Sequence, residues 1–290
     1  MNHKGIVAAN YGKELDVLTL AGDMITCELS RDLGDKPVAG DRVSYEEHGD
    51  QRYLTSIEPR ERIIRRAGGR EGEERILAAH VDLALVISSV KPKLKEGLID
   101  RYLVALHQEG IEPLIVLNKK DLDDGTHWAR IAEYTKIGYK TFLVCAKSGD
   151  GVDALRDELH DQTCVLVGHS GVGKSTLLMK LLPEVETAIS DISEWSGKGV
   201  HTTSTARLYA GPDGMRIIDS PGIRAFGLAG ITPPEVGRYF IEFEDHASHC
   251  RFRDCLHMND DGCAVRAALD RGEIGKLRYE SYVRIVESLT

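Results

Sequence analysis

The sequence has little of what marks membrane, secreted or nucleic-acid-coating proteins. No stretch approaches the ~20 apolar residues of a membrane-spanning helix, and Met1 to Gly5 do not open a signal peptide. The formal net charge of -9 argues against a general nucleic-acid coat, although a local basic surface can exist within an acidic total. From these absences we expect a soluble, cytoplasmic protein.

Cysteine is also scarce: the chain of 290 residues has six, and only the last three form a cluster, Cys250-x4-Cys255-x-His257-x5-Cys263. In a reducing compartment such a cluster indicates a metal before it indicates disulfides. Three thiolates and one imidazole suit a closed tetrahedral Zn²⁺ site, and a metal would stabilise a region with few apolar residues. We predict one structural zinc ion bound by Cys250, Cys255, His257 and Cys263. His246 and His249 are the alternatives for the fourth ligand.

The most informative stretch runs from Gly168 to Ser175 and reads G-H-S-G-V-G-K-S, the pattern of a phosphate-binding loop. It lies between a strand-like run and a helix-like run, as such a loop requires. Glycines let backbone N–H groups surround phosphate oxygens, and the helix N-terminus adds partial positive charge. Lys174 would neutralise the β- and γ-phosphates during catalysis, and the Ser175 hydroxyl would bind Mg²⁺. The predicted nucleotide contacts here are Gly168, Ser170, Gly171, Val172, Gly173, Lys174, Ser175 and Thr176.

A second motif, Asn118-Lys119-Lys120-Asp121, follows a strand-like run and has the N-K-x-D pattern that selects guanine. Asp121 can accept hydrogen bonds from the guanine N1–H and exocyclic amine, a pair of donors that adenine does not offer. The stem of Lys119 can lie along the base. The motif therefore favours GTP and disfavours ATP.

The tripeptide Cys145-Ala146-Lys147 follows another strand-like run. In GTPases the corresponding turn usually reads S-A-K, and the alanine N–H meets the guanine O6. Cys145 replaces the serine here, whereas the backbone donor at Ala146 is kept. We predict that all three residues border the guanine.

Two switch segments are predicted to contact magnesium and the γ-phosphate. Residues 196–205 would present Thr202 or Thr203 to Mg²⁺, and the sequence does not decide between them. The D-S-P-G run at 219–222 would hold Mg²⁺ through water with Asp219 and meet the γ-phosphate with the Gly222 N–H.

The order of these motifs is rotated, because the N-K-x-D motif precedes the phosphate loop. Such an order predicts a circularly permuted GTPase domain, which is permissible when chain termini lie close together on a compact domain. The second switch segment then leads directly into whatever follows the domain.

Changes of pattern along the chain suggest its domains. Residues 1–62 hold five short β-like runs and predict an OB-fold barrel, with an SH3-like docking barrel as the alternative. Residues 63–75 predict a flexible basic linker, whose arginines either contact phosphate or are merely solvated. Residues 76–229 alternate apolar runs and helical patterns, which predicts an α/β GTPase domain with a parallel sheet. Residues 230–290 predict a zinc-binding, mostly helical domain.

In this order, the barrel, the GTPase motifs and the C-x4-C-x-H-x5-C cluster resemble the circularly permuted family called ribosome small-subunit-dependent GTPase A (RsgA, YjeQ or YloQ). The resemblance implies a bacterial assembly factor that binds GTP or GDP, the maturing small ribosomal subunit and its 16S rRNA near the decoding region. It implies that the subunit stimulates GTP hydrolysis and that hydrolysis releases the factor. We expect a monomer. The alternative is a GTP-dependent protein-docking module, which the acidic net charge favours slightly.

Ras-like proteins carry a glutamine just after the D-x-x-G glycine, and this glutamine orients the attacking water. Ile223 occupies that position and has no hydrogen-bonding atom. We hypothesise that His201, in the first switch segment, orients the water. A structural or RNA-contacting role for His201 is the alternative.

Overall fold

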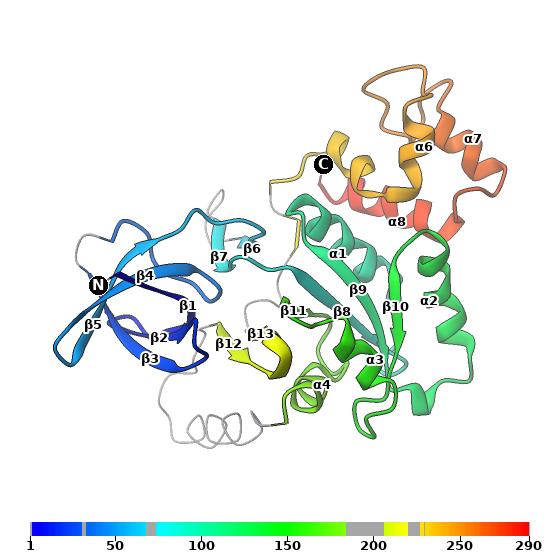
Figure 1. Ribbon diagram of the computed structural model, residues 1–290. Coiled ribbons are helices and arrows are strands. Elements are labelled where there is room, and N and C mark those ends of the chain that lie inside the picture. The colour runs from blue at the N-terminus through cyan, green and yellow to red at the C-terminus, as the bar shows by residue number, and fades with distance from the viewer. Residues whose placement is uncertain are drawn as a thin grey trace.

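The computed structural model describes residues 2–30, 33–67, 74–183, 206–219, 227–228 and 230–289. Figure 1 shows three units: a β-barrel, a sheet covered by helices, and a helical module at the C-terminal end. Among the described residues, no helix is both long and apolar enough to cross a membrane.

The N-terminal unit is a closed five-stranded barrel, formed by β1 (Asn2–Asn10), β2 (Glu14–Thr19), β3 (Met24–Leu29), β4 (Arg42–His48) and β5 (Gln51–Ile57). The strands pair in the order β1-β2-β3-β5-β4, and β4 closes the barrel on β1. This Greek-key order confirms the OB-fold prediction. Alternate residues point inward and fill the barrel with Val7, Leu15, Val17, Cys27, Val43, Tyr45 and Leu54.

The central unit is a mostly parallel sheet in the order β10-β9-β8-β11-β13-β12. Its strands are β8 (Leu83–Ser89), β9 (Glu112–Asn118), β10 (Lys140–Leu143), β11 (Thr163–Val167), β12 (Arg207–Ala210) and β13 (Arg216–Asp219). Only β12 runs antiparallel to its neighbour β13. The carboxyl ends of the five parallel strands therefore meet at one edge, where ligands bind in open α/β sheets.

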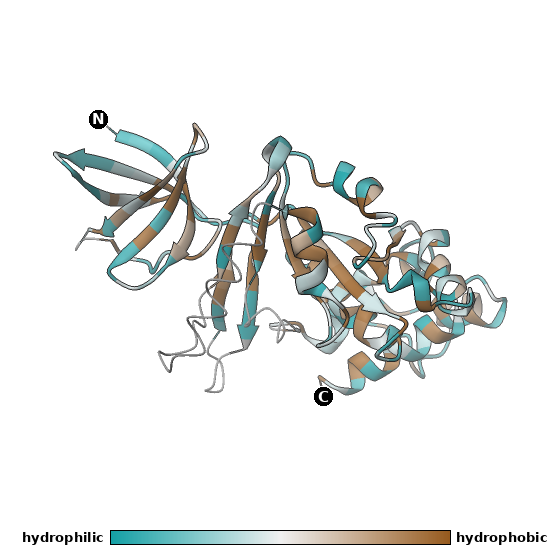
Figure 2. Cartoon of the chain, turned by 90° about the horizontal axis from the view of Figure 1, so that it is seen from below, coloured by the Kyte–Doolittle hydropathy of each residue, from teal (hydrophilic) through white to brown (hydrophobic). Residues whose placement is uncertain are grey.

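Helices cover both faces of this sheet (Figure 1). Residues alternate along each strand, so Ala84 and Val86 of β8 face α1 (Glu96–Gln108) and α2 (Thr126–Lys136). Leu85 of β8 faces the other layer, made by α3 (Val152–Asp157) and α4 (Lys174–Leu181). Figure 2 shows the apolar strands between these helices. The predicted helix-covered parallel sheet is confirmed.

The barrel and the sheet are joined edge to edge. β12, whose short and partly polar sequence gave no strand signal, pairs with β1 through Ala9 and Arg207. Arg207 also lies 3.7 Å from the carboxylate of Asp16 and donates to the Tyr11 hydroxyl at 3.2 Å. Barrel and sheet thus form one continuous set of strands.

The segment predicted as a flexible basic linker instead contains two paired strands, β6 (Ile64–Ala67) and β7 (Glu74–Ala78). Ile64 is fully buried against the α1 side of the sheet and anchors β6, so the described ends of this segment are paired strands rather than flexible chain. Arg65 forms ion pairs with Glu74 at 3.0 Å and with Glu109 at 2.9 Å.

The C-terminal module consists of short helices around an aromatic core. Its elements are η5 (Pro233–Tyr239), η6 (Ile241–Phe243), α6 (Glu244–Ala247), α7 (Ala264–Asp270) and α8 (Lys276–Glu287). Two further single turns, η1 (Lys120–Leu122) and η3 (Pro212–Gly214), belong to the central unit. Phe240, Phe243 and Tyr282 are buried together, and Val104 of α1 joins the same cluster. The module therefore packs directly on α1.

A buried ion pair adds to this contact. Arg278 of α8 donates to Glu242 at 2.7 and 3.0 Å and also binds Asp100 of α1, which is 1% exposed. The Tyr134 hydroxyl of α2 donates to Asp100 at 2.7 Å, and the Arg278 guanidinium lies 4.4 Å from the Phe240 ring centroid. Burial alone would lower the pKa of Arg278. The carboxylates of Asp100 and Glu242 outweigh this effect and raise the pKa above its ordinary value.

Candidate nucleotide site and metal centre

The carboxyl edge of the sheet brings the guanine and phosphate motifs together. Asn118, at the end of β9, is 2% exposed and donates from Nδ2 to the Val172 carbonyl of the phosphate loop at 2.9 Å. Its Oδ1 accepts the N–H groups of Lys119 at 2.8 Å and Ala146 at 2.9 Å. One amide side chain thus connects three of the predicted nucleotide-binding segments. The Ala146 donor, predicted to meet guanine O6, is engaged by Asn118 in this structure.

Lys119 lies along the side of the phosphate loop. Its backbone is left-handed, with φ 63°, and its Nζ donates to the Gly171 carbonyl at 2.8 Å. The same ammonium binds the Lys91 carbonyl in the loop between β8 and α1, where the Ser89 hydroxyl donates at 2.9 Å. Sequence reasoning missed this loop, because no nucleotide motif includes it.

Cys145 can act as a hydrogen-bond donor in the place where GTPases usually carry a serine. Its Sγ donates to Asp121 Oδ1 at 3.1 Å, and its side chain is buried whereas Asp121 is exposed. The contact orients the carboxylate that is predicted to read guanine. Lys147 is exposed beside this turn, and Lys120 pairs with Asp150 at 2.8 Å.

The phosphate loop requires glycine at two positions for steric reasons. A Cβ on Gly168, whose φ is 147°, would lie 2.2 Å from the Ile87 carbonyl oxygen. A Cβ on Gly173, whose φ is 98°, would lie 2.3 Å from Nδ2 of Asn118. Glycine at 173 thus permits the contact that holds the two motifs together.

The side chains predicted to bind phosphate lie at or near the N-terminus of α4. Lys174 Nζ donates to the carbonyls of Gly168 at 2.7 Å and His169 at 2.8 Å. Ser175 and Thr176 are exposed in the first turn of α4, and Ser170 is exposed in the loop. Asp219 is half-buried at the end of β13, the strand next to β11.

Four predicted site residues lie outside the described part of the chain: His201, Thr202, Thr203 and Gly222. Their predicted roles in water positioning, magnesium binding and γ-phosphate contact are untested by the geometry.

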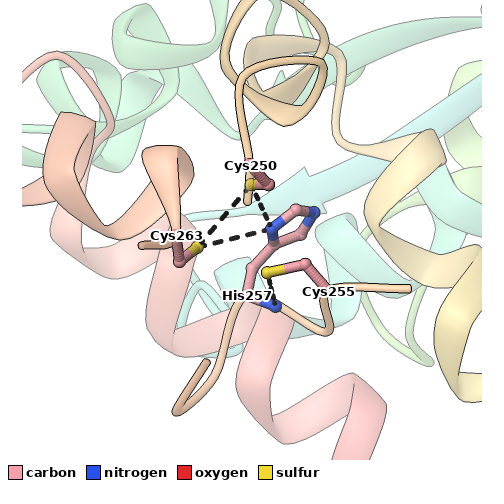
Figure 3. A group of neighbouring side chains, drawn as sticks. All are labelled: Cys250, Cys255, His257 and Cys263. Atoms are coloured by element: carbon pink, nitrogen blue, oxygen red, sulfur yellow. Dashed lines mark hydrogen bonds between the residues drawn. The ribbon is translucent and has the colours of Figure 1, made fainter. Parts of the chain in front are cut away.

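The cysteine cluster forms a compact donor set in the C-terminal module (Figure 3). The Sγ atoms of Cys250 and Cys263 are 4.0 Å apart, and each lies 3.5 Å from His257 Nδ1. A tetrahedral ion with bonds of ~2.3 Å to sulfur and ~2.05 Å to nitrogen would require separations of ~3.8 and ~3.6 Å. Together with Cys255, these atoms lie within 4.8 Å of one another, so the set could hold a metal ion.

The two alternative histidines are engaged elsewhere. His246 lies 3.9 Å from Glu273, and the ring of His249 is within hydrogen-bonding distance of the Asp245 carbonyl at 3.0 Å. Neither belongs to the donor set, which contains His257 as predicted.

The surroundings of the donor set also fit a cation. The Cys263 sulfur accepts the Arg266 N–H at 3.4 Å at the start of α7, and Cys255 accepts the His257 N–H at 3.4 Å. Burial raises the pKa of Cys255 to about 12 and lowers the pKa of His257. Burial therefore favours the neutral imidazole that a metal ligand requires, and a bound dication would favour the thiolates.

Comparison with known proteins gives matches over the whole chain. A family model described as RsgA GTPase matches residues 57–229. Small ribosomal subunit biogenesis GTPase RsgA 1 of Vibrio vulnificus (strain YJ016) is 40% identical over 298 residues, covering 99% of this chain and 84% of that protein. Small ribosomal subunit biogenesis GTPase RsgA of Haemophilus influenzae (strain 86-028NP) is 40% identical over 298 residues, covering 100% and 86%.

Two solved structures share the whole fold. YjeQ from Thermotoga maritima has a TM-score of 0.82 and 29% identity, covering 100% of this chain and 99% of that chain. YloQ, described as a circularly permuted GTPase, has a TM-score of 0.80 and 26% identity, covering 100% and 95%. The rotated motif order is thus shared with a known permuted GTPase fold.

Proposed function

The chain belongs to the RsgA GTPase family, and from this premise we propose that it hydrolyses GTP while it assists late maturation of the small ribosomal subunit. The observation that carries the proposal is Asn118, which connects the guanine motif, the Ala146 turn and the phosphate loop at one edge of the sheet. Relatives whose names include small ribosomal subunit biogenesis support the partner.

The residues around this edge have distinct roles in the proposed reaction. Asp121, oriented by Cys145, accepts the guanine N1–H and amine, and Lys119 and Lys147 flank the base. Lys174 exchanges the carbonyls of its own loop for the β- and γ-phosphate oxygens. The backbone N–H groups of the loop and the N-terminus of α4 stabilise negative charge on the phosphates.

Magnesium is the proposed companion of the nucleotide, and it would neutralise charge that develops on the phosphates. The residues proposed to hold it are Ser175, Asp219 and either Thr202 or Thr203, and Gly222 is proposed to contact the γ-phosphate.

His201 is proposed to orient the attacking water when the subunit orders the first switch segment. We expect His201→Ala to bind GTP normally and to lose most of the subunit-stimulated turnover. Its turnover without subunits should stay near the slow unassisted range of ~10⁻⁴ to 10⁻² s⁻¹. Stimulated turnover equal to that of the unsubstituted protein would contradict the assignment.

The donor set of Cys250, Cys255, His257 and Cys263 is proposed to hold a structural zinc ion, which would stabilise the loops of the C-terminal module. All four positions are protein ligands, so no position is open for substrate.

We propose four divisions of the chain: an OB-fold barrel (1–62), a basic connecting segment (63–75), the permuted GTPase domain (76–229) and the zinc-binding domain (230–290). A factor that acts on ribosomal subunits works in the cytoplasm, and we propose that it does so as a monomer with 16S rRNA as a contact.

The decisive experiment measures GTP turnover with and without purified small ribosomal subunits. Sedimentation with subunits in a non-hydrolysable GTP analogue, at increasing salt, measures binding separately. We expect binding at low salt and strongly stimulated turnover. Failure to bind at low salt would defeat the proposal and favour the protein-docking alternative.

A further inference from the structure

The structure shows which basic side chains are paired with acids and which are exposed to solvent. The arginine-rich segment after the barrel is the most basic run of the sequence, but three of its arginines form ion pairs within the protein. Arg60 pairs with the fully buried Asp41 at 2.8 Å, and Arg62 pairs with Asp82 at 2.7 Å. Arg65 is held by two glutamates, as described above. This segment therefore offers less free charge than its sequence suggests.

A different segment keeps its charge exposed. We call residues 91–95, Lys-Pro-Lys-Leu-Lys, the lysine loop. Lys91, Lys93 and Lys95 are exposed, and none of them takes part in the ion pairs found among the described residues. Glu96, the acid that follows, faces Arg130 instead. In a chain with a net charge of -9, three exposed lysines in five residues, without an ion pair in the described part of the chain, form a local basic surface.

The lysine loop is anchored and presents its charges outward. Leu94 is 3% exposed and packs into the core with α1, so the side chains on either side of it face solvent. Lys95 is the N-cap of the 13-residue α1, whose N-terminus adds partial positive charge to the same surface.

The loop also borders the nucleotide site. Lys119 binds the Lys91 carbonyl and the Gly171 carbonyl with one ammonium group. A small cavity beneath the lysine loop is lined mainly by residues of β8 and α1, and His169 and Val172 of the phosphate loop complete its wall. A ligand on the lysine loop would therefore contact the wall of the nucleotide site.

We propose that the lysine loop binds the phosphate backbone of an RNA strand beside the nucleotide site. The source of that strand is the rRNA of the small subunit, and to that extent the inference rests on the proposed function. Lysines contact phosphates without reading sequence, and each contact contributes to salt-dependent affinity. Protein interfaces, by contrast, favour aromatic residues and exclude lysine from their centre. The large apolar side chains that are exposed among the described residues all lie outside this loop.

The test compares two variants with the same change in charge. Lys93→Gln/Lys95→Gln removes two charges from the lysine loop. Lys180→Gln/Lys276→Gln removes two charges from exposed lysines elsewhere and is the matched control. Lys93→Arg/Lys95→Arg preserves the charge. Each full-length protein is measured for binding to deproteinised small-subunit rRNA and to intact small subunits, over a range of salt concentrations.

We expect the loop variant to bind rRNA more weakly and to reduce the slope of log K against log salt by about 1.5, since each lost phosphate contact reduces it by ~0.7 to ~0.9. The control and the arginine variant should keep the slope of the unsubstituted protein. GTP affinity and subunit-free turnover should stay unchanged in all three.

Equal slopes for the loop variant and the control would overturn the inference, as would absence of rRNA binding by the unsubstituted protein. Weaker binding to intact subunits alone, with unchanged binding to rRNA, would assign the loop to an acidic protein and also overturn it. A further outcome separates the two proposals. If the slope of log K against log salt for rRNA depends on the lysines, but intact subunits neither bind the protein nor stimulate its turnover, the inference is supported and the proposed function fails.

Discussion

The metal centre and the nucleotide site are built in opposite ways. The four proposed metal ligands come from one stretch, residues 250–263, in loops between short helices. The residues proposed to bind the nucleotide come from separate loops that the parallel sheet brings to one edge. Asn118 joins three of those segments with neutral hydrogen bonds, whereas the proposed metal ligands lie close together and burial raises the pKa of the Cys255 thiol. We infer that the sheet shapes the nucleotide site without its ligand, and that the metal centre needs its ion.

Removal of two proposed metal ligands should produce the largest effect. That effect should be confined to the C-terminal module and should leave the nucleotide site unchanged. We expect Cys250→Ala/Cys255→Ala to lose its zinc and the cooperative unfolding of the C-terminal module, because structural zinc contributes ~10–16 kcal/mol of apparent binding free energy. GTP affinity should change little. Metal analysis, thermal unfolding and GTP titration measure the three quantities. Cys27→Ala is the control, and retention of bound zinc by the double variant would contradict the assignment.

Arg278 tests whether the two regions are joined by a buried ion pair. Arg278→Met leaves Asp100 and Glu242 without their partner, and we expect the free energy of unfolding to fall by about 3–5 kcal/mol. Arg271→Met is the matched control, because its pair with Glu273 is exposed to solvent and contributes little to stability. Chemical unfolding measures both. Equal losses in the two variants would show that the buried pair is no stronger than the exposed one.

A substitution at Asp121 should affect the nucleotide site and leave the metal centre unchanged. We expect Asp121→Asn to weaken GTP binding at least about a hundredfold, because two hydrogen bonds to a charged group are lost at ~1.5–3 kcal/mol each. Xanthosine triphosphate should gain affinity, since its C2 carbonyl can accept from the new amide. Zinc content should stay constant. Asp124→Asn, an exposed residue of the same turn, is the control, and unchanged GTP affinity in Asp121→Asn would refute the guanine assignment.

Cys145 should give the smallest effect. Cys145→Ala removes the Sγ contact to Asp121, and we expect about a fivefold loss of GTP affinity, in line with ~1 kcal/mol for one hydrogen bond. Cys145→Ser keeps a donor and should bind GTP like the unsubstituted protein. Equal affinities for the alanine and serine variants would show that the thiol does not orient Asp121.

Motifs and long apolar runs were predicted well because they follow local rules. β8, β9 and β11 are buried on both faces and therefore read as continuous apolar runs, and the phosphate loop follows β11 as its pattern requires. The grouping of Cys250, Cys255, His257 and Cys263, which could hold a metal ion, was predicted from spacing alone. The strands β6, β7 and β12 were missed, because runs of four or five residues show no clear periodicity and become strands only by pairing, β6 with β7 and β12 with β13 and β1.

Charge was predicted least well, because neutralisation depends on contacts across the fold. Sequence alone placed the basic surface in the arginine-rich segment, and the structure pairs Arg60, Arg62 and Arg65 with acids far away in the sequence or on the neighbouring strand. The exposed lysines at 91–95 drew no attention in the sequence, because a short run of charge does not show whether it is free.

The sequence by itself determined the chemistry of this protein: a guanine motif, a phosphate loop and a cysteine–histidine metal set, in an order that requires a permuted sheet. Those properties lie in the identity and spacing of neighbouring residues. Only the tertiary structure decided that Asn118 joins the nucleotide loops, that Arg278 fixes the metal-binding module on α1, and which positive charges stay exposed. These depend on burial and on pairs of residues far apart in the chain, and such pairs form only when the sheet and its helices have packed.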